Sequence, residues 1–151
     1  MYSLIKHPVF LSAFFSWLLS QVLKSLIDIL RKRPNTARSV LLHIFWATGG
    51  MPSSHSSVVT ALATSLGFIF GVDSPLFILA VFYGFLTIRD ALGVRRATGS
   101  QAIVLNELIR ELSGKFDISA KTVKEIHGHN FSEVSVGVLL GFFIAVAFCN
   151  L

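Results

Sequence analysis

Apolar residues in this chain gather into long runs that are separated by short polar stretches. A helix needs about 20 mostly apolar residues to cross a bilayer. Four runs reach or approach that length: 8–30, 53–72, 74–90 and 131–150. Only Val72-Asp73-Ser74-Pro75 links the second run to the third, which predicts a tight hairpin. The pattern predicts an all-α integral membrane protein, a compact bundle of about four transmembrane helices that forms a single domain over residues 1–151.

The segments between these runs follow other patterns. The apolar piece Val40–Ala47 is too short to span a bilayer, and it is interpreted as an interfacial or re-entrant turn. The stretch QAIVLNELIRELSG, residues 101–114, carries apolar side chains on one broad face, which predicts a cytoplasmic amphipathic helix closed by Gly114. That helix is expected to lie along the membrane surface or against the bundle. A second short helix is expected at about 119–127, stopping at Gly128.

Composition and charge agree with a membrane protein and orient it. Hydrophobic residues make up 53% of the chain and charged residues 14%, against about 25% charged residues in soluble domains. The formal net charge is +5, but so apolar a chain does not suit a solvated domain that binds nucleic acid. Basic residues concentrate in 31–38 and 95–124, and the positive-inside rule places both segments in the cytoplasm. The helix ends beside them are therefore expected to meet at the cytoplasmic face of the cell inner membrane or its equivalent, where basic loops attract anionic lipid headgroups.

Two glycine pairs predict close helix packing. Gly67/Gly71 and Gly137/Gly141 each have the GxxxG spacing, which lets neighbouring helices approach closely. Packing within one subunit is the preferred interpretation, and a homodimer through these helices is the alternative.

A narrow polar stripe runs along the first span. Gln21, Lys24, Asp28 and Arg31 follow i, i+3, i+7, i+10 spacing, which places them within about 80° on one helix face. Charges inside a span are costly unless they face the bundle interior or a watery cavity. The alternative is a pair of snorkelling side chains, Lys24 and Arg31, with one internal Lys24–Asp28 ion pair. A stripe this narrow favours a site.

The stretch TGGMPSSHSS, residues 48–57, interrupts the longest uncharged part of the chain. Pro52 suits the first turn of a helix, and the glycines before it permit an unusual backbone path. N–H groups at such a helix start attract anions, and the hydroxyls of Ser53 and Ser54 add donors. His55 is expected one turn inside the helix. A histidine near the end of a membrane helix is more often a packing residue, but the glycine-serine setting favours a functional one.

The fourth span opens with IHGHNFSEVSVG, which contains a histidine and a carboxylate four residues apart. Glu133 can hold the tautomer of the His129 imidazole from the same helix face. Alternatively, Asn130 caps the helix with Glu133 as its capping-box partner, and His129 lies outside it. The two interpretations are compatible if Glu133 does both. His127 is a second candidate nucleophile, and His43 is interpreted as structural.

The end of the third span carries arginines and one carboxylate. Adjacent arginines commonly anchor a helix among lipid headgroups, but the planar guanidinium also matches phosphate. Asp90 is placed to hold one arginine, and Arg95 or Arg96 is expected to enter the site, whereas Arg89 belongs to the span itself. No metal and no cofactor are expected, because residues at i and i+2, such as His127 and His129, point apart on a helix and no second acidic cluster accompanies them.

Three stretches, in this order, resemble signatures of one superfamily. They are TGGMPSSHS at 48–56, DALGVRRATGSQAIVLN at 90–106 and GHNFSEVSVG at 128–137. The chain resembles the type-2 phosphatidic acid phosphatase superfamily, which includes the vanadium haloperoxidases, and more closely its small, divergent bacterial and plastid membrane branch. The resemblance covers nearly the whole chain. It implies metal-free hydrolysis of a phosphoester through a phosphohistidine.

The resemblance also implies roles for individual residues. His129 would be the nucleophile, and Glu133 takes the place of the aspartate that orients it. His55 would be the general acid that protonates the departing alkoxide. Lys24 and Arg31 match the lysine and arginine that neutralise phosphate oxygens.

Some positions depart from the superfamily's pattern around the phosphate. A proline follows Arg33 rather than Arg31, so either arginine is a candidate for that role. Ser54 replaces the glycine of the PSGH motif.

The third motif also departs from the pattern. Val123 stands six residues before His129, where the superfamily has an arginine. Arg95 and Arg96 are the expected substitutes, with Lys124 behind them.

These observations predict a metal-independent lipid phosphate phosphatase whose substrate headgroup enters from the cytoplasmic leaflet. Phosphatidylglycerol phosphate or phosphatidic acid is the favoured substrate, and an isoprenyl diphosphate is the alternative. Two other functions stay open: a transporter or channel that moves protons or anions through the same polar groups, and a non-enzymatic scaffold that binds anionic lipid.

Overall fold

A computed structural model describes residues 4–30, 50–116, 121–123, 125 and 128–151. Its elements are the short helix η1 (Leu4–Lys6), α1 (Pro8–Leu30), α3 (Ser54–Phe70), α4 (Pro75–Leu92), α5 (Val94–Phe116) and α6 (Phe131–Asn150). The described part of the chain contains helices and no strand. The predicted all-α fold is confirmed. The expected re-entrant turn at 40–47 lies outside the described residues.

In the part of the chain that the structure describes, three helical stretches are long and apolar enough to cross a membrane: Pro8–Ile27, the stretch that begins at Pro75, and Phe131–Asn150. The helix α3 is apolar but has 17 residues, which rise about 25 Å. Because a hydrocarbon core is about 30 Å thick, α3 is a short fourth span that depends on its neighbours for cover. All four helices lie within a few residues of the apolar runs in the sequence.

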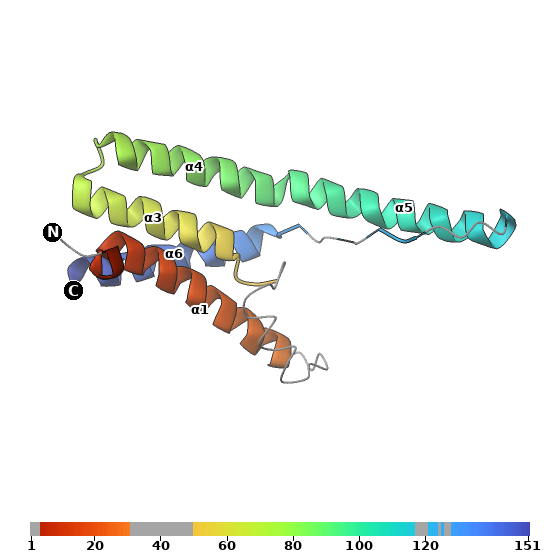
Figure 1. Ribbon diagram of the computed structural model, residues 1–151, viewed down its shortest axis with the longest axis horizontal. Helices are drawn as coiled ribbons and strands as arrows, with labels where there is room; N and C mark the ends of the chain where they lie inside the picture. The colour runs from red at the N-terminus through yellow and green to blue at the C-terminus, as the bar shows by residue number, and fades with distance from the viewer. Residues whose placement is uncertain (1–3, 31–49, 117–120, 124, 126–127) are drawn as a thin grey trace.

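The helix α3 is the centre of the bundle and packs against α1, α4 and α6 (Figure 1). Glycines of α6 let the two backbones touch: a Cβ atom at Gly137 would collide with the carbonyl oxygen of Ser53, and one at Gly141 with that of Ser57. A Cβ at Gly67 of α3 would lie 2.9 Å from the ring of Phe77 on α4. These three glycines therefore serve packing within the chain, as expected.

Gly71 has a different role from the one its GxxxG spacing predicts. It ends α3 with φ of 84°, a conformation that favours glycine, and a Cβ there would meet nothing within 4 Å. The predicted hairpin follows at once, and the Ser74 hydroxyl caps α4 by accepting from the N–H of Phe77 at 3.2 Å. Gly71 therefore terminates a helix and does not pack one.

The bundle has small polar residues inside and large apolar ones outside. The interior includes Ala61, Ala145 and a series of fully buried serines, whereas α4 exposes Phe82 and Phe85. This is the reverse of a soluble domain. It suits a bilayer, because lipid covers the outer apolar side chains and small interior residues let the helices approach.

The amphipathic helix α5 differs from its prediction in two respects. It continues through Gly114 to Phe116, since a helical glycine with open space around it does not stop a helix. It also runs on from α4 and points away from the bundle (Figure 1), so it does not lie against the other helices. Only Gly93 separates α4 from α5, and the N–H of Ala97 bonds its carbonyl at 3.0 Å, which leaves no room for a reversal.

The expected short helix at 119–127 is wrong for the residues described there. Lys121–Val123 and Glu125 are not helical. The Asn106 side chain donates to the carbonyl of Val123 at 2.9 Å and accepts from its N–H at 2.8 Å, and it also donates to Glu125 Oε1 at 2.8 Å. The buried amide of Asn106 thus bonds the backbone N–H and C=O of Val123, which a helix would otherwise have paired. The described residues of this segment lie beside α5 (Figure 1).

Candidate active site

The site is built where α3 and α6 begin. The N–H of Ser53, the residue that caps α3, donates to the carbonyl oxygen of Glu133 in the first turn of α6 at 2.9 Å. The two helices then run in the same direction (Figure 1). A helix start carries a partial positive charge and exposes N–H groups, so two adjacent starts form a place that favours an anion.

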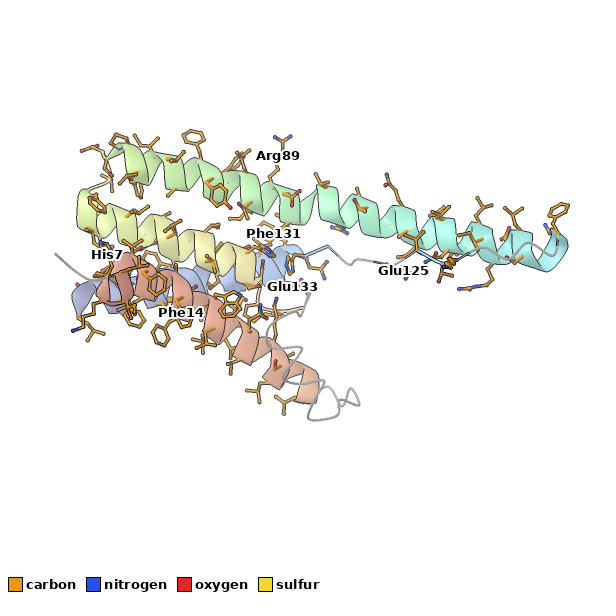
Figure 2. All side chains as sticks on the ribbon, in the orientation of Figure 1. His7, Phe14, Arg89, Glu125, Phe131 and Glu133 are labelled. Carbon is orange, nitrogen blue, oxygen red and sulfur yellow. The ribbon has the colours of Figure 1, made fainter. Side chains whose placement is uncertain are left out.

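His129 and Glu133 form the pair that the sequence predicts. The Nδ1 atom of His129 lies 2.9 Å from Oε2 of Glu133, and the histidine is 4% exposed. A carboxylate accepts hydrogen bonds, so Nδ1 carries the hydrogen and the lone pair of a neutral ring lies on Nε2. Figure 2 shows Glu133 at the start of α6.

Glu133 also caps its helix. Its Oε2 accepts a hydrogen bond from the N–H of Asn130 at 3.2 Å, and its own N–H donates to the Asn130 carbonyl at 3.1 Å. The helix cap and the His129–Glu133 pair, which the sequence leaves as alternatives, are therefore both present, and His129 stands just before the helix. One carboxylate joins the start of the helix to the imidazole.

The end of α4 fixes the backbone around His129. The N–H of His129 donates to the carbonyl of Ala91 at 3.3 Å. A Cβ at Gly128 would lie 2.5 Å from both N and Cα of Arg96, so the chain passes the start of α5 at a distance that only glycine permits. The second and third signature stretches are thus in contact. The sequence marks Gly128 as part of a signature but does not indicate which backbone it approaches.

Lys24 brings a buried ammonium group to the same end of α3. It is 3% exposed, and its Nζ donates to the hydroxyl of Ser54 at 3.2 Å. Gln21, one turn earlier, is also buried, so these members of the predicted stripe face the bundle interior. The side chain of Asp28, and Arg31 as a whole, lie outside the described part of the structure.

His55 lies at the same end of the bundle, but not at the expected depth. The helix starts at Ser54 with Ser53 as its cap, so His55 is in the first turn rather than one turn inside, and its side chain is exposed. Pro52 stands before the cap, fully buried, and not in the first turn. Val59 follows His55 by one turn and faces Gly84 of α4. His55 therefore lies on the side of α3 that faces α4, whose last turn holds the backbone of His129.

The two serines of the motif have separate roles. The hydroxyl of Ser53 accepts from the N–H of Ser56 at 3.4 Å and from its hydroxyl at 3.0 Å. Because its own N–H bonds Glu133, Ser53 builds the junction of the two helices instead of offering that N–H to an anion. Ser54 faces Lys24.

The structure places the basic residues and Asp90 only in part. Arg96 contacts Gly128 through its backbone and exposes its side chain, and Arg89 lies on the outer side of α4 (Figure 2). Asp90 is half-buried beside Ala91. Several candidates lie outside the described residues or side chains: Arg33, His43, the side chain of Arg95, Lys124 and His127. Among the described residues, no three His, Cys, Asp or Glu side chains gather in a way that would hold a metal ion.

Sequence reasoning missed the hydroxyl contacts that join α1 to α3. The Oγ atoms of Ser16 on α1 and Ser57 on α3 lie 2.5 Å apart. The hydroxyl of Ser20 donates to the carbonyl of Ser16 within α1 at 2.7 Å. The spacing of Ser12, Ser16 and Ser20 at every fourth position was a signal that these residues share one helix face. The Ser16–Ser57 contact holds α1 antiparallel to the first turns of α3, and so holds Lys24 at Ser54 (Figure 1).

Comparison with known proteins agrees with this arrangement. The sequence profile of the Divergent PAP2 family matches residues 5–144. The chain belongs to the Divergent PAP2 family. It is 34% identical over 148 residues to the uncharacterized membrane protein YuiD of Bacillus subtilis (strain 168), with 90% of each chain covered. No solved structure matches the chain. Membership of the Divergent PAP2 family confirms the resemblance seen in the three signatures.

Proposed function

We propose that this Divergent PAP2 family member is a metal-independent lipid phosphate phosphatase with His129 as its nucleophile. One observation carries the proposal: the His129–Glu133 pair, at 2.9 Å, stands where the starts of α3 and α6 meet. A nucleophilic imidazole needs a group that holds its tautomer, and a phosphate needs positive potential. This end of the bundle offers both.

In the proposed reaction, Nε2 of His129 attacks phosphorus. The P–O bond to the lipid alcohol breaks as the N–P bond forms, and His55 gives a proton to the departing oxygen. A positioned acid of this kind contributes about 10²–10⁴-fold to the rate. Water then attacks the phosphohistidine, which releases phosphate and restores the imidazole. Exposure of the His55 side chain supports a role in which it meets a substrate that arrives from outside the bundle.

The charge around the phosphate comes from several elements. The ammonium of Lys24 on α1 lies at the Ser54 hydroxyl on α3, and the two helix starts add N–H groups. The remaining polar contacts around the phosphate are proposed to come from Arg31, Arg95, Arg96 and Asp90. Phosphoryl transfer relies almost entirely on such positioning and charge stabilisation, so a basic cup without a metal can suffice.

Charge along the chain supports a cytoplasmic site and a lipid made inside the cell. Segments 31–38 and 95–124 are basic and flank the helix ends that meet at His129. Phosphatidylglycerol phosphate or phosphatidic acid is therefore the proposed substrate, with an isoprenyl diphosphate as the second choice.

The test is phosphate release from a panel of lipid phosphates by the purified protein in detergent with EDTA present. The His129→Ala and His55→Ala variants should lose at least about 10²-fold in kcat, and vanadate should inhibit as a mimic of five-coordinate phosphorus. His7→Ala is the matched control. His7 caps the opposite end of α1, about 25 Å from Lys24 along the helix, and should leave activity unchanged.

Two results would reject the proposal. One is wild-type activity that survives both histidine substitutions, and the other is the absence of phosphate release from every lipid in the panel. Activity that disappears with EDTA and returns with a divalent cation would assign a different mechanism.

A further inference from the structure

Next to Lys24, α1 holds two buried side-chain oxygen atoms that have no hydrogen-bond partner in the protein. Gln21 is 5% exposed and its Oε1 is buried without a partner, and the hydroxyl of Ser25 is in the same condition. They stand four residues apart and so share one face of the helix. Three other buried polar side chains of this helix have partners: Ser16 bonds Ser57, Ser20 bonds a backbone carbonyl and Lys24 bonds Ser54.

Burial of an amide without a partner is costly, because the group gives up its bonds to water and receives none in return. A residue of this kind inside a membrane bundle marks a functional position more often than a structural one. An apolar side chain would fill the same space at no such cost. We infer that Gln21 and Ser25 are a subsite for a ligand group.

The neighbours of the pair define the ligand. Gln21 precedes Lys24 by three residues, about 4.5 Å along the axis and on nearly the same face. Lys24 is the cation that meets the phosphate in the proposed function, on which this inference rests. The group bound by Gln21 therefore lies a few bonds from the phosphorus. A hydroxyl both donates and accepts, so it satisfies the amide oxygen of Gln21 and the Ser25 hydroxyl together.

The inference names the substrate class: a phospholipid whose phosphorylated headgroup is a polyol, such as glycerol phosphate. Phosphatidic acid has ester carbonyls near its phosphate, but these only accept and leave the oxygen of Gln21 unpaired. A prenyl chain offers no hydrogen bond at all. Gln21 and Ser25 are thus specificity-determining residues that favour a phosphatidylglycerol phosphate over both.

Two lipids that differ in one hydroxyl test this inference. The purified full chain is assayed with phosphatidylglycerol phosphate and with an analogue that has propanediol phosphate in place of glycerol phosphate. We expect kcat/KM to be at least about tenfold higher for the lipid with the hydroxyl, because a buried hydrogen-bonding site rejects a substrate that leaves it unpaired. Gln21→Leu should lower kcat/KM for the lipid with the hydroxyl, and so bring that ratio to about one. Ser65→Ala, which removes a hydroxyl already bonded within α3, should keep the wild-type ratio.

Equal kcat/KM values for the two lipids in the wild type would overturn the inference and leave the proposed function standing. So would a Gln21→Leu variant that slows both lipids equally. Failure to release phosphate from either lipid would instead refute the proposed function.

Two measurements of the unfolding temperature test the subsite without catalysis. Soluble glycerol phosphate should raise the unfolding temperature of the wild type more than propanediol phosphate does. In Gln21→Leu the two compounds should raise the unfolding temperature by the same amount. Equal rises in the wild type would overturn the inference. Without ligand, Gln21→Leu should unfold at a higher temperature than the wild type, since it removes an unpaired amide. A lower unfolding temperature would show that Gln21 is a structural residue.

Discussion

The N–H of Ser53 donates to the carbonyl oxygen of Glu133 across 2.9 Å. The N–H of a helix cap has no partner within its own helix, so this bond satisfies the start of α3 with the first turn of α6. It also joins the two stretches that carry the candidate histidines, because His55 follows Ser53 by two residues and His129 bonds Glu133. Stretches more than seventy positions apart in the chain are thereby brought to one end of the bundle.

The contact between α3 and α6 leaves no room for a side chain at Gly137. A Cβ there would collide with the Ser53 carbonyl, so we expect Gly137→Ala to destabilise the protein by about 1–3 kcal/mol and to reduce activity by separating the two helix starts. Thermal unfolding in detergent measures the effect. Gly114→Ala is the control, since a Cβ at Gly114 meets nothing within 4 Å and alanine in a helix is favoured by about 0.5–1 kcal/mol. Equal effects of the two substitutions would contradict the packing described.

The Glu133→Gln variant distinguishes two roles of Glu133, orienting the imidazole of His129 and capping α6. Glutamine also serves in a capping box, so the helix start should remain intact and the unfolding temperature should change little. The imidazole loses its carboxylate partner, and kcat should fall by about 10²-fold or more. Glu111→Gln, on the exposed surface of α5, should leave kcat unchanged. A fall in stability that accounts for the whole loss of activity would indicate that Glu133 is only a cap.

Much of the fold could be predicted because its signals are local. Three of these signals come from neighbouring residues. They are the apolar runs of membrane length, Ser74-Pro75 at the start of one helix, and Asn130 with Glu133 at the start of another. The His129–Glu133 pair is of the same kind, since spacing of four residues alone brings the two side chains together.

Two of the features that could not be predicted depend on contacts between distant segments. Asn106 holds Val123 through two backbone bonds, which replaces the expected helix there by an extended segment. The position of His55 differs for a local reason: Ser53 caps α3, so Pro52 stands before the helix and His55 lies in its first turn. Gly128 is required by the backbone of Arg96. Neither Val123 nor Arg96 lies within one helical turn of the residue it contacts, so periodicity carries no information about these two contacts.

Lys24 is expected to act on binding. Lys24→Met keeps an unbranched side chain one atom shorter and removes the charge at the Ser54 hydroxyl. KM for the lipid phosphate should rise by about tenfold or more, which corresponds to about 1.4 kcal/mol, and inhibition by vanadate should weaken in parallel. Lys115→Met on α5, at an exposed position, provides the control. An unchanged vanadate affinity in Lys24→Met would remove Lys24 from the phosphate site.

The proposal that Arg96 replaces the missing arginine of the third motif can be tested with Arg89 as a control. Arg96 passes Gly128, next to His129, whereas Arg89 points away from α3 on the outer side of its helix (Figure 2). Arg96→Ala should lower kcat/KM by about tenfold or more, and Arg89→Ala should have little effect on it. Steady-state phosphate release measures both. A larger loss for Arg89→Ala would exclude Arg96 as the substitute.

The orientation of the bundle can be tested at two exposed positions that lie on opposite sides of the membrane if the basic segments face the cytoplasm. Asp73 lies in the hairpin between α3 and α4, and Lys121 lies in the segment beside α5. In a Cys149→Ser background, a membrane-impermeant maleimide added to intact cells should label the Asp73→Cys variant. It should label the Lys121→Cys variant only after the membrane is opened, because the positive-inside rule keeps segment 95–124 in the cytoplasm. The opposite labelling pattern would place His129 and Lys24 on the outer face, and the substrate would then have to come from the outer leaflet.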